Sequence, residues 1–386
     1  MYKILGVLLV VLAVSASWAT PAVAQSGTTT SSNPSWLTQP VATVITGALA
    51  VTTAVIALVG VLLNRRQTER HFTKTHELEQ IKGLRERYTT CAEQLAHANP
   101  AVRQAGVYAL AALADDWNKT TTTAAVSSPG PGEGVAVEIH EESRVCLDLL
   151  CAYLRSSTES EDGEVRQSIA AVIRRHALSW RSYTYDLRRA DLTNVVLVDA
   201  NLTGADLIGA DMTSANLSGA NLTEADLIGA TLSRAHLVNA NLVRADMDSA
   251  RLDRANLKDA KLNEANLAST NLSNADLTGS DLTGARLTGT ALVDANLTGA
   301  MLASADLTSA DLKGADLSSA YLGNACLRHA DLAGANLKAA NLTGADLHRT
   351  NLNGADLSGA ELHMISAGVI YNDDTVWPAG WTLPPR

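Results

Sequence analysis

Leucine or methionine recurs at every fifth position from Leu187 to Leu362, in 36 consecutive units, with methionine only at 212 and 247. A five-residue step rotates an α-helix by about 500°, so a helix would scatter these side chains around its axis. An uninterrupted strand would send them to alternate faces, because five is an odd number. Only a backbone that turns once per unit keeps every leucine inside. This period therefore constrains the fold of residues 185–362 more than any other feature.

Alanine stands two positions before the leucine in 30 of the 36 units. Residues two apart in extended backbone point the same way, so alanine and leucine face inward while their neighbours face outward. A narrow interior of this kind agrees with a chain that is 46% hydrophobic but only 4% aromatic. The positions without alanine are Tyr185, Val195, Thr270, Ser280, Thr290 and Thr350.

The repeated A-[DN]-L-x-x motif, as in residues 205–209 and 345–349, resembles the pentapeptide-repeat family. The resemblance implies a mainly β fold, a right-handed quadrilateral β-helix with four units per coil, and about nine coils over residues 185–362. Residues 84–177 also resemble the helical leader of membrane-linked actinobacterial pentapeptide-repeat proteins. Residues 368–381 are similar to the terminator that follows many such solenoids.

The two ends of a solenoid expose unpaired backbone groups and an apolar interior, so each end needs a cap. We expect the helical module to cover the first coil. At the other end we expect residues 363–386 to form a C-terminal cap, with Trp377, Pro378 and Trp381 over the last coil.

The N-terminal region has no charged residue between Lys3 and Arg65. Residues 1–24 have the form of a secretory signal peptide or of an uncleaved first span. A Ser/Thr/Pro-rich linker, residues 25–40, separates them from the apolar run 41–63. As a helix this run would reach about 34 Å, enough to cross a hydrocarbon core of about 30 Å. The sequence therefore predicts a transmembrane helix at 41–63.

Basic residues follow the predicted span directly, at Arg65, Arg66, Arg70 and Lys74. Because the upstream flank is uncharged, the positive-inside bias places residues 65–386 in the cytoplasm, whether or not the first segment is removed. We therefore expect a protein of the cell membrane whose repeats face the cytoplasm.

The middle of the chain has helical character. We predict a juxtamembrane helix over residues 64–83 and an α-helical module over 84–178, with a Thr/Ser/Pro/Gly-rich loop at 118–134. Asn99-Pro100 is typical of an N-cap followed by a first helical residue. The helix that it begins is expected to end near Trp117.

Composition argues against several classes of function. The net charge of −10 disfavours direct contact with nucleic-acid phosphates. No Gly-rich phosphate loop, zinc spacing or nucleophile elbow is present, so we predict a non-catalytic protein with no metal or cofactor. We interpret the four cysteines as reduced, buried thiols, in agreement with a cytosolic environment. They are Cys91, Cys146, Cys151 and Cys326.

Residues 20 apart should form ladders on the outside of the coils. One ladder is rich in aspartate from Asp186 onward, and we expect these carboxylates to bond to local backbone rather than to hold a metal. The same face ends in a basic cluster, in which Arg328 and His329 on one coil adjoin His348 and Arg349 on the next. This cluster is either an anion or partner site or a solvated surface.

These features favour a membrane-tethered, non-catalytic scaffold whose solenoid binds an unidentified protein partner. The resemblance offers an alternative, since some pentapeptide-repeat proteins protect DNA gyrase by mimicking duplex DNA with an acidic rod. Residues 187–362 carry 21 acidic and 13 basic side chains, a net charge of −8 that is acidic but mixed. A secreted or surface solenoid would require 41–63 to fail as a span. The pattern specifies no oligomeric state.

Overall fold

The structure is a computed structural model that describes residues 75–122, 141–156, 162–363 and 368–381. The chain divides into two units, Met1–Thr43 and Val44–Arg386, and every described residue belongs to the second. The predicted signal segment, linker and transmembrane helix all lie outside the described residues. None of the helices that are described is long and apolar enough to cross a membrane.

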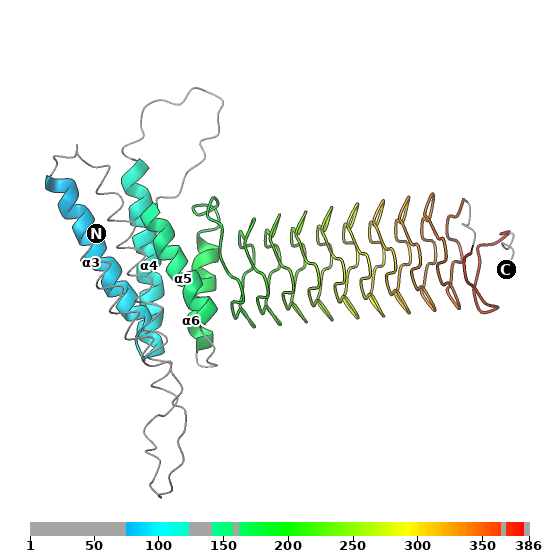
Figure 1. Ribbon diagram of the computed structural model, residues 1–386, viewed down its shortest axis with the longest axis horizontal. Helices are drawn as coiled ribbons and strands as arrows, with labels where there is room; N and C mark the ends of the chain where they lie inside the picture. The colour runs from blue at the N-terminus through cyan, green and yellow to red at the C-terminus, as the bar shows by residue number, and fades with distance from the viewer. Residues whose placement is uncertain (1–74, 123–140, 157–161, 364–367, 382–386) are drawn as a thin grey trace, which may run out of the picture. The chain divides into compact units, whose positions relative to one another are not determined.

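The described part of the chain begins with helices (Figure 1). They are α3 (Thr75–Leu95), α4 (Pro100–Thr122), α5 (Glu141–Ser156) and α6 (Gly163–Arg175). Helix α4 packs against α3, α5 and α6. Its first turn is capped by Asn99, whose Oδ1 accepts the Ala101 N–H at 2.9 Å, so the prediction for Asn99-Pro100 is confirmed.

Helix α3 runs unbroken through residue 83, so the predicted juxtamembrane helix continues into the helical module, and the division of the chain at residue 83 stays a prediction. One predicted boundary in this region is wrong. Helix α4 continues past Trp117 to Thr122, whereas a loop was expected from residue 118. Tertiary contacts explain the extension, because Trp117 is buried and Asn118 accepts a hydrogen bond from Ser143 of α5 at 2.9 Å.

The core of the helical module uses large side chains from all of these helices. Leu95, Leu110, Leu154 and Ile169 are at most 2% exposed. A Cβ at Gly106 of α4 would lie 2.7 Å from the backbone nitrogen of Leu95, so only glycine permits this approach of α4 to α3. The module is therefore a well-packed helical unit.

The repeats form a stack of coils (Figure 1). Parallel bridges join residues 20 apart, one in each pentapeptide, from Asp186 and Asp206 to Asn341 and Glu361. Leucine N–H groups donate to a carbonyl 19 residues ahead, and bridge-residue N–H groups donate to one 21 residues behind. This register confirms four units per coil, and 36 units then make nine coils.

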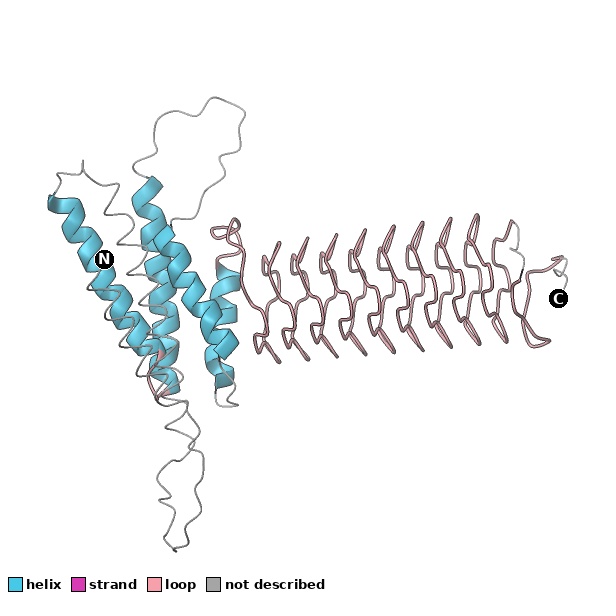
Figure 2. Cartoon of the chain, viewed as in Figure 1, coloured by secondary structure: helices cyan, strands magenta, loops and turns pink. Residues whose placement is uncertain are grey.

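The walls of the coils are made of single bridge residues, so Figure 2 draws the repeats as loops and turns. Between one unit and the next the Ala210 N–H donates to the Leu207 carbonyl at 3.0 Å, which closes a turn. The residue before each such alanine has a positive φ even where it is not glycine, as in Arg189 (56°) and Glu224 (59°). The β-helix pairing is as expected, but longer strands do not form because the backbone turns every five residues. Right-handedness stays a prediction.

The interior follows the predicted alternation, with Leu267 at 1% exposure and Ala265 at 0%. Threonines that replace alanine keep their hydroxyls bonded to the carbonyl 23 residues earlier. The bonds are Thr270 to Met247, Thr290 to Leu267 and Thr350 to Leu327, each at 2.7 Å. Ser280 is also fully buried, and its hydroxyl has no hydrogen-bond partner among the described residues.

The helical module caps the first coil, as expected. The Asp191 N–H donates to the carbonyl of Leu154 at 3.1 Å, and the Val196 N–H donates to Oε1 of Gln167 at 3.1 Å. The Gln167 amide nitrogen donates in turn to the Asn194 carbonyl at 3.0 Å. Helices α5 and α6 thus satisfy backbone groups that another coil would otherwise pair.

The last coil is completed by the segment 368–381. The Ile370 N–H donates to the Thr350 carbonyl at 2.9 Å. Thr375 donates its hydroxyl to the Leu352 carbonyl 23 residues earlier, which is the bond that the inward threonines of the repeats make. Trp377 and Trp381 pack against the core, which confirms their predicted place in the cap.

Candidate functional site

Two of the four predicted site residues come together on successive coils. The rings of His329 and His348 lie edge to face, with centroids 6.3 Å apart and planes at 88°. The backbone N–H of His329 donates to the His348 carbonyl at 3.0 Å, so the coil register fixes this pairing. The two imidazoles therefore form one surface feature.

The two arginines of the cluster are placed differently. Arg328 Nε donates to Asp346 Oδ2 at 2.5 Å, and this bond raises the pKa of the Arg328 guanidinium. Arg349 has no ion-pair partner among the described residues, and its side chain lies close to Gly368 of the terminal segment. The charge of Arg328 is therefore offset, and Arg349 carries the remaining fixed positive charge. A role for this cluster in binding stays a prediction.

The Arg328 pair belongs to a pattern that runs along the solenoid. A basic residue directly after the leucine pairs with an aspartate 18 positions later, one coil further on. The nitrogen-to-oxygen distances are 3.3 Å for Arg188–Asp206, 3.0 Å for Lys313–Asp331, 2.5 Å for Arg328–Asp346 and 3.3 Å for Lys338–Asp356. These exposed pairs neutralise basic side chains locally.

The aspartate-rich ladder bonds to its own backbone, as expected. Oδ1 of Asp226 accepts the Ile228 N–H at 3.2 Å, and Oδ1 of Asp306 accepts the Thr308 N–H at 3.0 Å. No group of three His, Cys, Asp or Glu side chains in the described ranges is placed to hold a metal ion. The absence of catalysis and of a cofactor stays a prediction.

The cysteine interpretation needs one correction. All four cysteines are free, and Cys91, Cys146 and Cys151 are buried. Cys326 is only partly buried, because it occupies an outward bridge position, and its sulfur lies 3.2 Å from the Thr308 hydroxyl.

An exposed apolar pair was missed in the sequence. Met301 and Tyr321 form a parallel bridge on adjacent coils, and they are 41% and 57% exposed. The other residues of their ladder are polar or charged: Asn201, Asn221, Asn241, Lys261, Asp281, Asn341 and Glu361. Comparing every twentieth residue from Asn201 would have revealed the pair.

The apolar pair and the basic cluster occupy adjacent sides of the solenoid. Tyr321 and Arg328 belong to successive pentapeptides, separated by the turn before the buried Ala325. Cys326, the bridge residue of the second of these pentapeptides, lies between Tyr321 and Arg328 in the chain. We call these six residues the coil-seven surface, after the coil of Tyr321, although they span the sixth to the ninth coil: Met301, Tyr321, Arg328, His329, His348 and Arg349.

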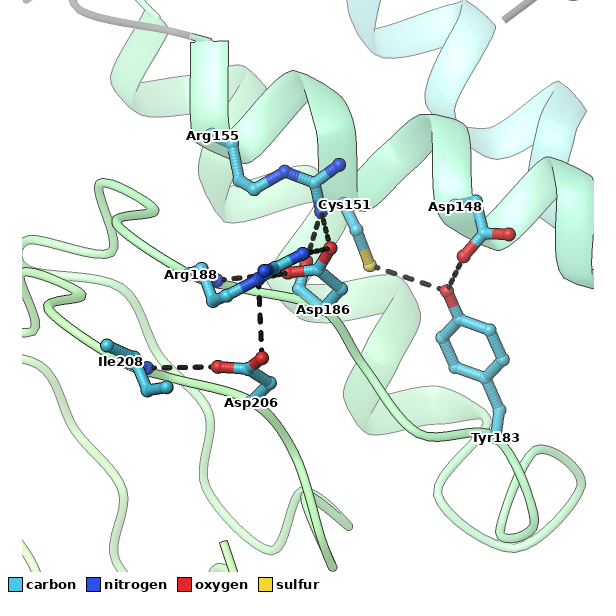
Figure 3. Close-up of polar contacts among 8 residues, drawn as sticks. All are labelled: Asp148, Cys151, Arg155, Tyr183, Asp186, Arg188, Asp206 and Ile208. Atoms are coloured by element: carbon cyan, nitrogen blue, oxygen red, sulfur yellow. Dashed lines mark hydrogen bonds and ion pairs between the residues drawn. The ribbon is translucent and has the colours of Figure 1, made fainter. Parts of the chain in front are cut away.

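A second polar region joins α5 to the first coils (Figure 3). Arg155 of α5 donates to the Asp186 carbonyl at 2.5 Å and lies 3.1 Å from its carboxylate. Arg188 bridges the carboxylates of Asp186 and Asp206. The hydrogen bond from Arg188 is the main cause of a lowered pKa for Asp186. These contacts lock the module to the solenoid.

The same view shows a buried polar group inside this junction (Figure 3). The Tyr183 hydroxyl donates to Asp148 at 2.6 Å and lies 3.7 Å from the sulfur of Cys151. Burial raises the pKa of the Tyr183 phenol, and it raises the pKa of the Cys151 thiol to about 12. A thiol of this kind is protonated at neutral pH, so the group is structural rather than nucleophilic.

Comparisons with known proteins agree with the repeat architecture. The profile of the family described as pentapeptide repeats matches segments between residues 186 and 363. No curated protein matches the chain. A solved structure, HetL from the cyanobacterium Nostoc sp. strain PCC 7120, involved in heterocyst differentiation regulation, is 34% identical with a TM-score of 0.26. The match covers 53% of this chain and 98% of HetL.

Two further structures are similar. A pentapeptide repeat protein from the thylakoid lumen of Arabidopsis thaliana is 32% identical over 25% of this chain and 68% of that chain, with a TM-score of 0.25. QnrB1, a plasmid-mediated fluoroquinolone resistance protein, is 20% identical over 46% of this chain and 92% of its own, with a TM-score of 0.32. From its repeat pattern, its profile match and its 34% identity to HetL, the chain belongs to the pentapeptide-repeat family.

Proposed function

We propose that this protein is a membrane-tethered, non-catalytic scaffold whose solenoid recruits a protein partner on the cytoplasmic side. The observation that carries the proposal is the exposure of Met301 and Tyr321 on adjacent coils, within a ladder that is otherwise polar. Methionine and tyrosine are enriched where proteins bind one another, because they supply adaptable or rigid apolar contact area. Nothing inside the solenoid requires them at these outward positions.

The coil-seven surface also indicates the chemistry of the partner. An apolar side chain of the partner would seat on Met301 and Tyr321. A carboxylate beside it would face Arg349 and the paired imidazoles of His329 and His348. The partner is therefore a protein segment with an apolar anchor and a neighbouring acidic residue. Such a contact combines a salt-insensitive part with a part that salt screens over about 8 Å at physiological ionic strength.

The proposal of a membrane tether is supported by the sequence of the N-terminal region. The uncharged run 41–63 is long enough to span a bilayer, and Arg65, Arg66 and Arg70 follow it. The solenoid would then be held within reach of the inner membrane surface. External protease should leave the repeats of intact cells uncut and should digest them in inverted vesicles. Digestion on whole cells would contradict this orientation.

Recruitment is tested by proximity labelling from the full chain in its native membrane. The double variant Met301→Asn, Tyr321→Asn introduces the residue that is commonest in this ladder, so the solenoid should fold normally. We expect the specific labelling pattern of the wild type to be lost. Ser273→Asp, an outward change away from the coil-seven surface, is the matched control and should leave the pattern intact. The same labelling pattern in the wild type, the double variant and Ser273→Asp would contradict the proposal.

We do not extend the proposal to duplex-DNA mimicry, because the described rod carries mixed charge. Lys313 lies between Asp311 and Asp331, at 3.3 and 3.0 Å, and Lys338 lies beside Asp356. Such pairs interrupt the continuous negative surface that a mimic of DNA phosphates requires. A supercoiling assay with purified gyrase distinguishes a scaffold from a DNA mimic. A change in gyrase activity on addition of the solenoid would favour mimicry.

A further inference from the structure

A groove lies where the helical module meets the solenoid. It has a volume of about 450 Å³, and its walls come from α4, α6 and the first coil. Tyr108, Arg174, Arg175 and Asp199 are the polar residues among those that line it. Small-molecule sites commonly have volumes of about 300–1,000 Å³ and commonly lie where two structural units meet. The groove has the size and position of a ligand site.

The groove lining carries two arginines and one carboxylate, so its net charge is positive. Arg174 is held in place because its Nε donates to the Val198 carbonyl at 3.2 Å, which leaves its terminal nitrogens available. Arg175 has neither a hydrogen-bond nor an ion-pair partner among the described residues. Asp199 is the only carboxylate in the lining, and its Oδ1 lies over Gly219 of the next coil. Two guanidinium groups with free donors are suited to phosphate oxygens.

A tyrosine completes the lining. Tyr108 of α4 is 48% exposed and lies on the outward face of the helix, with the exposed residues Ala105 and Ala112. An exposed aromatic ring beside guanidinium groups offers a planar surface to a ligand ring, while the arginines hold an anion. Ala171, Val172 and Val198 complete the lining.

From these features we propose that the groove binds a phosphate-bearing ligand with a planar ring, of the nucleotide class. Arg174 and Arg175 bind the phosphate, and Tyr108 stacks on the ring. The ligand bridges α4, α6 and the first coil, so its binding stiffens the junction between module and solenoid. The groove and the coil-seven surface share no residue, so this site is independent of the proposed recruitment.

The test is calorimetric titration of the full-length chain in detergent at low salt, with ADP, adenosine and inorganic phosphate as separate probes. We expect ADP to bind more tightly than either of the other two. Arg175→Glu should weaken ADP binding by at least about tenfold, since it replaces a charged hydrogen-bond donor with a repelling group. Arg175→Gln is a second variant, with a smaller loss, that does not add a negative charge to the end of α6.

Two more variants identify which part of the ligand is recognised. Tyr108→Ala should weaken the binding of ADP and adenosine and leave that of phosphate unchanged. Arg254→Glu, an exposed arginine on the solenoid, is the control and should not affect any probe. The proposal is overturned if no probe binds, if phosphate binds as tightly as ADP with no effect of Tyr108→Ala, or if Arg254→Glu weakens ADP as much as Arg175→Glu does. Recruitment at the coil-seven surface should be the same in Arg175→Glu and in the wild type.

Discussion

The helical module and the solenoid build their interiors in different ways. In the module polar side chains make individual contacts, as where Oδ1 of Asp115 accepts the Trp180 indole N–H at 3.1 Å and Oδ2 of Asp115 lies 2.9 Å from Nε2 of His176. In the solenoid one arrangement of alanine and leucine recurs in every unit, and the polar backbone is paired between coils. The comparison teaches that single side chains specify the module, whereas a repeated pattern specifies the solenoid.

The largest expected effect comes from a charge inside the solenoid. Leu267→Asp places a carboxylate in a narrow apolar interior, and we expect it to cost several kcal/mol, unless the group is neutralised, because no partner is available. Ser273→Asp, on the outward side of the next unit, should be nearly silent. Denaturant melts of both variants measure the difference. Equal shifts would show that the inward and outward assignment is wrong.

Alkaline pH should destabilise the helical module more than the solenoid. Burial raises the pKa of Tyr183 above its ordinary value of 10.0, and that of Cys151 from 9.0 to about 12. The buried neutral forms therefore contribute stability that is present below these ordinary values and is lost as pH rises above them. The solenoid interior beyond Tyr185 contains no titratable side chain.

We therefore expect the module to unfold first as pH rises above about 10, while the repeats persist. Pulse proteolysis with an alkaline-stable protease, followed by mass spectrometry, locates the cuts. Cleavage within residues 187–362 before any cut in α3 to α6 would contradict the comparison.

A third test removes one hydrogen-bond acceptor from the helical module. Asp115→Ala leaves the buried Trp180 N–H without its acceptor, and we expect a loss of about 1–3 kcal/mol in the free energy of unfolding. The neighbouring Asp116 pairs with Arg87 on a more exposed surface, so Asp116→Ala should cost at most about 1 kcal/mol. A chemical melt followed by near-ultraviolet circular dichroism reports both. Similar losses would mean that the buried bond to Trp180 adds nothing.

The smallest effects come from two inward positions of the solenoid and have opposite signs. Thr290→Ala removes the 2.7 Å bond to the Leu267 carbonyl and should destabilise by about 1 kcal/mol. Ser280→Ala removes a buried hydroxyl that has no partner among the described residues, and it should stabilise by about as much. Thermal melts of the two variants should move in opposite directions. Destabilisation by Ser280→Ala would instead show that the Ser280 hydroxyl makes a stabilising hydrogen bond.

The sequence predicts these two regions to different degrees. In the repeats the five-residue period indicates which side chains face inward, so the alternation and the 20-residue register could be predicted. Both caps could be predicted because the ends of a solenoid need cover. In the module tertiary contacts decide the boundaries, and the contacts of Trp117 and Asn118 with the rest of the bundle are not visible in local composition. Helix α4 is longer than predicted for this reason.

The candidate sites follow the same division. Met301 and Tyr321 can be found from the ladder register, and so can the pairing of Arg328 with Asp346 once the offset of 18 residues is recognised. The groove cannot be found in this way. Tyr108, Arg174 and Asp199 come from three segments that no period relates, and only the packing of the module on the first coil brings them together.

The central claim is that the helical module takes the place of a missing coil at the first edge of the solenoid. Amide hydrogen exchange of the wild-type chain tests it most directly. The Asp191 and Val196 N–H groups are bonded to Leu154 and Gln167 of the module, so they should exchange as slowly as bridge-residue amides in the middle coils. Fast exchange at these two positions, with slow exchange only further along the stack, would show that the first coil is an open edge and would contradict the account.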